Sequence, residues 1–144
     1  MAQVKILKSQ ENNDMNHENL FLNNKSLPKD FTFPQEFIAF VSQKELPNLH
    51  PWWLLYTYEG AFDAWLKIVR KQYPSRSLIP FAKIEYTDDI ACFDGQDFSG
   101  NPKVFYVHSY ASPGWEDRGC VNNFSEWLKY ALEDAEEYQR EDNE

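Results

Sequence analysis

Residues 78–110 contain three apolar segments separated by two polar turns, and this pattern constrains the possible folds more than any other part of the sequence. The first two segments, Leu78–Ile84 and Ile90–Phe93, are joined by a short polar turn, which is typical of an antiparallel hairpin. A second turn over residues 94–102 contains two glycines and one proline, and apolar and polar residues then alternate along residues 103–110. We therefore predict a three-stranded antiparallel meander with one buried face, which the remaining chain must cover.

Two segments on either side of this meander have the apolar periodicity of amphipathic helices. Within residues 60–73 the apolar face consists of Phe62, Trp65, Leu66, Val69 and Tyr73. In the last segment it consists of Phe124, Trp127, Leu128, Ala131, Ala135 and Tyr138. Asn123 and Glu126 have the spacing of a capping box and predict where this last helix begins. The aromatic run over residues 54–58 predicts a further strand, so the whole pattern indicates an α+β fold with helices covering a mainly antiparallel sheet.

The beginning of the chain differs in character from the rest. Residues 1–26 are polar and rich in asparagine, so we expect a loosely held N-terminal arm. A single α+β domain then spans residues 27–140. Near its start, Thr32 and Gln35 have capping-box spacing and predict a short helix over about residues 33–43.

Length and composition exclude several classes of protein. With 144 residues, 42% of them hydrophobic and 17% aromatic, the chain can bury one core and does not have the composition of a disordered segment. No apolar run approaches the ~20 residues of a membrane span, and the N-terminal residues lack the apolar region of a secretory signal. We therefore expect a cytoplasmic protein. In that compartment Cys92 and Cys120 are expected to be packed thiols, and we expect no metal and no cofactor.

The formal net charge is −9, and the acidic residues are concentrated in the second half of the chain. Residues 123–144 contain eight Asp or Glu against two Lys or Arg. Such a chain is poorly suited to nucleic acids and to anionic membranes, which both select basic surfaces. A basic protein partner would be attracted by this charge, although acidic residues that only keep a protein in solution would give the same composition.

Three phrases of the sequence, taken in order, resemble one known family. They are LPKDFTFPQEFIAFV at the start of the domain, LIPFAKIEYTDDIACFD in the predicted hairpin, and PKVFYVHSY followed by VNNFSEWL. This order and spacing are similar to the SUKH superfamily, which includes fungal cell-wall assembly regulators and bacterial immunity proteins, over about residues 27–132. The resemblance implies an α+β domain without catalytic activity. For bacterial members it also implies an immunity protein that binds and neutralises a toxin, often a basic nuclease.

The predicted meander also places a candidate binding site. Its tip at residues 85–89 and the loop at 111–117 should lie at the same end of the sheet, with residues 94–102 at the other end. The first end would gather Glu85, Tyr86, Asp88, Asp89, Trp115, Glu116 and Asp117. Exposed Trp and Tyr side chains anchor protein interfaces, and carboxylates attract the Arg and Lys of a partner. The alternative is an ordinary charged turn, with Trp115 folded back onto the core and Arg118 neutralising part of the charge.

Other residues allow enzymatic or metal-binding alternatives. Cys92 and His108 fall on adjacent predicted strands and could form the Cys–His pair of a thiol hydrolase, but the apolar neighbours of Cys92 favour a packed thiol. Asp94 and Asp97 resemble the start of a calcium loop, but no closing glutamate follows at the required spacing. We therefore expect a non-catalytic protein-binding module of the immunity type, with a basic toxin as its partner. A regulatory or scaffold domain that binds an endogenous protein or a small ligand is the second hypothesis.

Overall fold

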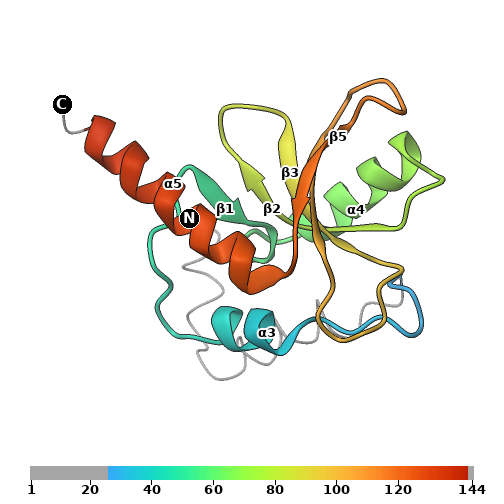
Figure 1. The fold of residues 1–144 in the computed structure, drawn as a ribbon, viewed down its shortest axis with the longest axis horizontal. Coiled ribbons are helices and arrows are strands. Elements are labelled where there is room, and N and C mark those ends of the chain that lie inside the picture. The colour runs from blue at the N-terminus through green and yellow to red at the C-terminus, as the bar shows by residue number, and fades with distance from the viewer. Residues whose placement is uncertain (1–25, 143–144) are drawn as a thin grey trace.

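Five strands, paired in sequence order, form one antiparallel sheet at the centre of the structure (Figure 1). The structure is a computed structural model and describes residues 26–142. The strands are β1 (Trp52–Leu54), β2 (Leu78–Ile84), β3 (Asp89–Asp94), β4 (Val104–His108) and β5 (Asp117–Val121). The helices are α3 (Gln35–Val41), the 3₁₀ helix η1 (Leu55–Thr57), α4 (Ala61–Gln72) and α5 (Phe124–Asp142). The predicted α+β class and antiparallel meander are confirmed, while residues 1–25 of the predicted arm lie outside the described residues.

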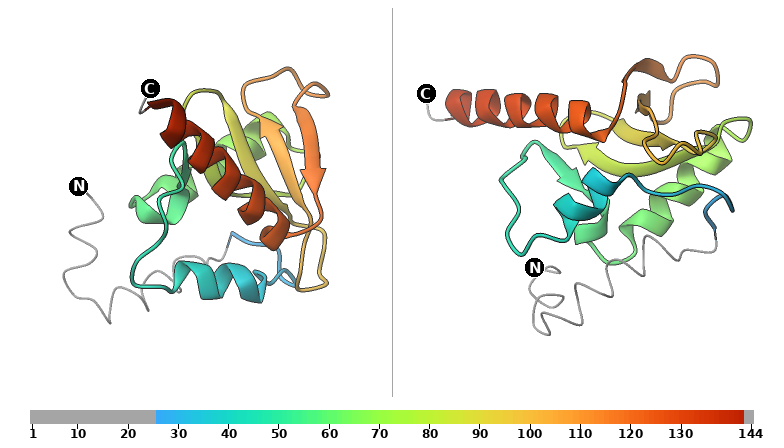
Figure 2. Two further views of the ribbon diagram at one scale, coloured as in Figure 1. Left: turned by 60° about the vertical axis from the view of Figure 1, so that its left-hand side comes forward. Right: turned by 60° about the horizontal axis from the view of Figure 1, so that its bottom comes forward.

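Helices cover both faces of the sheet (Figure 2). Val69 of α4 and Tyr73, which follows that helix, share a buried cluster with Ile90 and Cys92 of β3 on one face. Phe93 of β3 faces α3 and α5 on the opposite side. The prediction of a single buried face was therefore wrong. All four residues from Ile90 to Phe93 are fully buried, because an uninterrupted apolar run lets a strand bury both of its sides.

The face under α3 and α5 contains an aromatic core. Phe81 of β2 stacks on Phe93 of β3, with ring centroids 4.2 Å apart. Phe37 of α3 and Phe124 and Trp127 of α5 meet Phe81 edge-on, with ring centroids 5.7, 5.8 and 4.9 Å away. All five side chains are at most 1% exposed. This core joins both helices to the middle of the sheet, because edge-on and stacked rings are favourable packing geometries.

The two long helices bury the stripes predicted from their periodicity. The buried residues are Phe62, Leu66 and Val69 in α4, and Phe124, Trp127, Ala131 and Ala135 in α5. At the start of α5 the N–H of Glu126 donates to Asn123 Oδ1 over 2.9 Å, and the N–H of Asn122 donates to Glu126 Oε1 over 2.8 Å. The predicted capping box is thus present, with its return bond shifted to the preceding residue. By contrast, α3 begins after Pro34 without a side-chain cap, so the box predicted from Thr32 is not formed.

The strand predicted over residues 54–58 is wrong beyond its first residue. β1 ends at Leu54 and the chain continues as the 3₁₀ helix η1. The N–H of Tyr58 donates to the carbonyl oxygen of Leu55, and Thr57 Oγ1 donates to the carbonyl oxygen of Leu54. Leu55 and Tyr56 are both buried, and the hydrogen bond from residue 58 back to residue 55 is that of a 3₁₀ turn and not of a strand.

β5 begins at the last residue of the loop predicted over residues 111–117, where the sequence pattern predicts no strand. It is an edge strand that pairs only with β4, and residues 117–120 are exposed. Gly119 has a φ of 107°, and the register with β4 shifts between Phe105 and Val107. Val121 alone in this strand packs against the core, and the other residues are held by backbone pairing with β4, so hydrophobic periodicity gives no signal for the strand. Its irregular register also makes the edge a poor template for a further strand.

Candidate functional site

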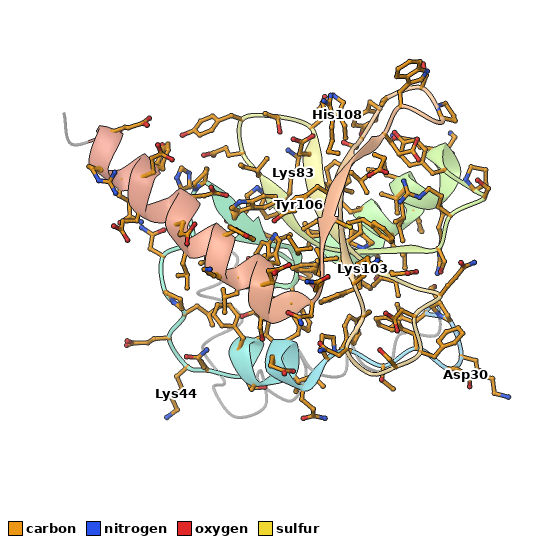
Figure 3. The ribbon with its side chains drawn as sticks, viewed as in Figure 1. Asp30, Lys44, Lys83, Lys103, Tyr106 and His108 are labelled. Carbon is orange, nitrogen blue, oxygen red and sulfur yellow. The ribbon has the colours of Figure 1, made fainter. Side chains whose placement is uncertain are left out.

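The β2–β3 turn and the β4–β5 loop lie at the same end of the sheet, as the meander predicted (Figure 1). Asp89 at the start of β3 is opposite His108 at the end of β4, which Figure 3 labels at this end. The N–H of Ser109 donates to the carbonyl oxygen of Asp88 over 2.9 Å and joins the two connections directly. Asp30 and Lys44 lie near the opposite end (Figure 3).

A tight turn over Ser112–Trp115 forms the tip of the β4–β5 loop. Pro113 and Gly114 occupy its two central positions, and the N–H of Trp115 donates to the carbonyl oxygen of Ser112 over 2.9 Å. Gly114 has a φ of 98°. Proline at the second position and a glycine of positive φ at the third define a type II turn. The local sequence Ser-Pro-Gly-Trp therefore determines the backbone that presents Trp115.

Glu116, the next residue, is buried and ties the turn to the body of the protein. Its Oε2 pairs with Arg76 Nη1 at 2.7 Å, and its Oε1 accepts the N–H of Gly114 at 2.7 Å. Its carbonyl oxygen accepts the N–H of His108 at 2.8 Å. The guanidinium of Arg76 also lies over the ring of Phe105, 5.1 Å from its centroid. Glu116 is thus part of the structure beneath the loop and is only 6% exposed, so it does not present its carboxylate to a partner.

The ionised form of Glu116 is stabilised by its hydrogen-bond partners. Burial alone raises the pKa of its carboxyl group, but the hydrogen bond from Arg76 and those from backbone N–H groups outweigh burial and lower the pKa below its ordinary value. The carboxylate therefore stays ionised although it is almost excluded from water. Arg118, which could neutralise part of the charge of this end of the sheet, is exposed on β5 and is not the partner of Glu116. Arg76 is 40 residues away in the chain, and no local signal identified it.

Two residues at the end of α4 hold the other half of the loop. The hydroxyl of Tyr73 lies 3.0 Å from the carbonyl oxygens of both His108 and Ala111. Gln72 Oε1 accepts the N–H of Tyr110 at 2.6 Å. Tyr110 has a φ of 65°, which is uncommon for a residue with a side chain and requires support from its surroundings. The loop is therefore anchored at both of its ends.

The most exposed aromatic side chains belong to this anchored loop. Trp115 is 78% exposed and Tyr110 is 63% exposed. Trp115 has the largest exposed fraction among the exposed large apolar side chains of residues 26–142. The alternative in which Trp115 folds back onto the core is thereby excluded.

Tyr86 lies at the same end but is directed toward α5. Its ring centroid is 5.5 Å from that of Tyr138, and the ring of His50 is 4.7 Å from Tyr138. His50 Nε2 also forms a hydrogen bond with Glu85 Oε2. The hydrogen bond with Tyr138 is the main cause that raises the pKa of Tyr86 to about 12. Tyr86 remains 59% exposed, so this side of the β2–β3 turn presents an aromatic surface next to the last turns of α5.

Three carboxylates of the candidate site already have polar partners within the protein. Glu85 pairs with His50, and Asp89 Oδ1 lies 2.7 Å from His108 Nδ1. Glu116 is paired and buried, as described above. Asp88 and Asp117 are the exposed carboxylates that remain beside the loop.

The last helix, α5, carries a dense group of exposed acidic residues, one of which, Asp134, also accepts a hydrogen bond from Trp52 Nε1 at 3.1 Å. The exposed acidic residues of α5 are Glu133, Asp134, Glu136, Glu137, Glu141 and Asp142. Across the sheet, α4 exposes Lys67, Arg70 and Lys71. Because α5 exposes more acidic than basic residues, a basic partner that approaches the loop end would be drawn toward the α5 side.

Cys92 and His108 are not brought together. Cys92 is opposite Phe105, whereas His108 is opposite Asp89 at the end of the strand. This register separates the two residues by about 10 Å, since a strand advances about 3.4 Å per residue. Burial also raises the pKa of the Cys92 thiol, which disfavours the thiolate needed for nucleophilic catalysis.

We expect the two cysteines to differ sharply in reactivity. Cys92 is fully buried and Cys120 is exposed, so a thiol reagent such as Ellman's reagent should label one cysteine per native chain and two after denaturation. Cys120→Ser should abolish labelling of the native protein. Rapid labelling of Cys92 in folded Cys120→Ser would contradict the burial of β3.

Asp94 and Asp97 shape the β3–β4 connection. Asp94 Oδ1 accepts the N–H of Gln96 at 2.9 Å, and Asp97 Oδ1 accepts the N–H of Ser99 at 3.0 Å. These are the local bonds of a structured turn. Within residues 26–142, no group of three or more His, Cys, Asp or Glu side chains is arranged to hold a metal ion.

None of the described helices combines the length and the apolar character needed to cross a membrane.

Comparisons of this chain with protein-family models, with curated proteins and with solved structures gave no match. The class that the structure defines is an α+β protein with a five-stranded antiparallel meander covered on both faces by helices. The resemblance to the SUKH superfamily therefore depends on the three sequence phrases given above.

Proposed function

We propose that this protein is a non-catalytic, cytoplasmic immunity protein that binds a basic toxin domain and covers its active site. The observation that carries the proposal is the anchored loop at one end of the sheet, which holds Trp115 78% exposed beside exposed Asp88 and Asp117. An exposed aromatic side chain with nearby carboxylates has the composition of a protein interface for a basic partner. The resemblance to the SUKH superfamily supports the immunity role.

The mechanism follows from size and charge. An interface of ordinary dimensions buries about 800 Å² on each partner, which is enough to close the active-site cleft of a small toxin domain. The acidic outer face of α5 would speed the encounter with a basic toxin, and the aromatic side chains of the loop end would then supply the contacts that are slow to dissociate. No chemical step on the toxin is required.

The test is growth protection by co-expression. Toxin domains encoded beside this gene are expressed alone and together with this protein, and the protein should restore growth and form a complex with one of them. Protection against none of them would reject the immunity role. A complex with a non-toxic protein of the host would favour the regulatory or scaffold function instead.

Charge reversal provides the matched test of the surface. Asp88→Lys combined with Asp117→Lys should slow association with the toxin by about tenfold at low salt and weaken its dependence on salt, because both exposed carboxylates lie beside the loop. Asp30→Lys combined with Glu45→Lys makes the same change in charge away from this end and serves as the control. The association rates of the two variants with the toxin are measured by surface plasmon resonance and compared with that of the wild type. Equal slowing by both pairs would show that only net charge matters.

A further inference from the structure

We propose that Trp115 is the central anchor of this interface, and that Arg76 and Glu116 are positioning residues that hold it ready for a protein or peptide segment in which large apolar side chains lie beside Lys or Arg. The inference rests on the proposed function and specifies the chemistry of the partner surface that contacts Trp115. Its starting point is the contrast between neighbouring residues. Trp115 is 78% exposed and Glu116, which follows it, is 6% exposed.

The exposure of Trp115 is the reverse of what folding alone favours. A Trp side chain offers roughly 150–250 Å² of largely apolar surface, and the loop holds it away from the core. Glu116, a charged residue, occupies the buried position instead. Trp is among the residues most often found at the energetic centre of a protein interface. The exposure of Trp115 next to the buried Glu116 is therefore better explained by a role in binding a partner than by a contribution to the stability of the fold.

The loop is ordered before any partner arrives. The type II turn fixes the backbone of Trp115 through its bond to Ser112, and Glu116 binds Gly114 within the same turn. Tyr73 and Gln72 fix the entry to the loop from α4. A binding group that is already held in one conformation loses little conformational entropy on association, which increases affinity without new contacts.

The buried ion pair is well placed for this positioning role. Arg76 and Glu116 meet at 2.7 Å beneath the loop, where two charges have been removed from most of their water. Such a pair contributes little net stability compared with apolar residues of similar size, because desolvation offsets the attraction. The pair instead fixes the orientation of the Glu116 carboxylate, because one of its oxygens accepts a hydrogen bond from Arg76 and the other accepts one from the N–H of Gly114. The carboxylate therefore couples the turn to the body of the protein.

The surroundings of Trp115 define the partner. Tyr110 is exposed on the same loop, and its ring lies 6.4 Å from that of Trp65 on α4, so the contact surface is aromatic. Asp88 and Asp117 are exposed beside it. A partner segment that packs large apolar side chains against the indole and carries Lys or Arg beside them complements both features. A second copy of this chain is a poor occupant, because each copy has a net charge of −9.

The experiment uses a phage-displayed library of random-sequence peptides, with the full-length protein as bait. Enriched peptides should combine Lys or Arg with large apolar residues, and Trp115→Ala should weaken their binding by about 30-fold or more. Phe98→Ala is the matched control, since Phe98 is also an exposed aromatic residue, at 53%, but belongs to the β3–β4 connection at the other end of the sheet. Unchanged binding to Trp115→Ala, or no enriched peptide, overturns the proposal.

The positioning role has its own readout. Glu116→Gln keeps oxygen and nitrogen atoms in place of the carboxylate, whereas Glu116→Ala removes the link to Gly114, so peptide affinity should fall in the order wild type, Gln variant, Ala variant. The ¹⁵N order parameter of the Trp115 indole N–H should fall in the same order. Equal order parameters in all three folded proteins would reject the positioning role.

These outcomes are separable from those of the proposed function. Peptides that bind through Trp115 while every toxin domain escapes neutralisation would reject the immunity role and keep the anchor. Growth protection that survives in Trp115→Ala with undiminished toxin affinity would keep the immunity role and reject the anchor.

Discussion

Replacing Phe81 by alanine should lower the free energy of unfolding by about 3–5 kcal/mol, the cost typical of truncating a buried aromatic side chain. Phe81 is 0% exposed and lies at the centre of the aromatic core, where its ring contacts Phe93, Phe124 and Trp127. Truncation removes the hydrophobic contribution of the ring and also leaves a cavity between the sheet and α5. The surrounding rings are rigid, so they can fill little of that cavity.

Urea denaturation at neutral pH measures this effect. Phe81→Leu, which keeps most of the volume, should cost clearly less than Phe81→Ala. Phe98→Ala removes an exposed ring and should change stability by no more than about 0.5 kcal/mol. A loss below about 1 kcal/mol for Phe81→Ala would contradict the packing of β2 and β3 against α5.

Removing Arg76 should have the second largest effect. Arg76→Ala leaves the buried carboxylate of Glu116 without its charged partner, and breaking a buried pair from one side costs about 3–5 kcal/mol. The side chain of Arg76 is 23% exposed, so water can replace part of the interaction. We therefore expect a loss of about 2–3 kcal/mol. Arg140→Ala breaks an exposed pair with Glu136 on α5 and should cost less than about 0.5 kcal/mol.

The pH dependence of the free energy of unfolding tests whether the ionised carboxylate of Glu116 stabilises the fold. The pKa of Glu116 is lowered in the folded protein from an ordinary value of 4.5, so its ionised form stabilises the fold above that pH. This contribution is lost as the pH falls below 4.5 and through the folded pKa. The difference in stability between wild type and Glu116→Gln should therefore be largest at neutral pH and shrink on acidification. A difference that stays constant down to pH 3 would show that the charge of Glu116 is not involved.

Part of the candidate site could be predicted because a meander has regular geometry. Successive turns of an antiparallel sheet alternate between its two ends, so the order of the apolar segments alone places Tyr86 and Trp115 at the same end. The burial and the partners of each side chain at this end could not be predicted in this way. Glu116 and Asp117 are adjacent acidic residues, yet one is buried and the other exposed. The difference depends on Arg76, which approaches from the end of α4.

Local sequence patterns were sufficient to predict the meander, the two amphipathic helices α4 and α5, and the capping box that begins α5. The edge strand β5, the burial of both sheet faces, the histidine partners of Glu85 and Asp89, and the ion pair of Glu116 depend on the folded arrangement of distant segments. The physical reason is the range of the interactions. Periodicity records which side of an element faces the core, whereas backbone pairing at an edge and charge pairing depend on which distant residues the fold brings close.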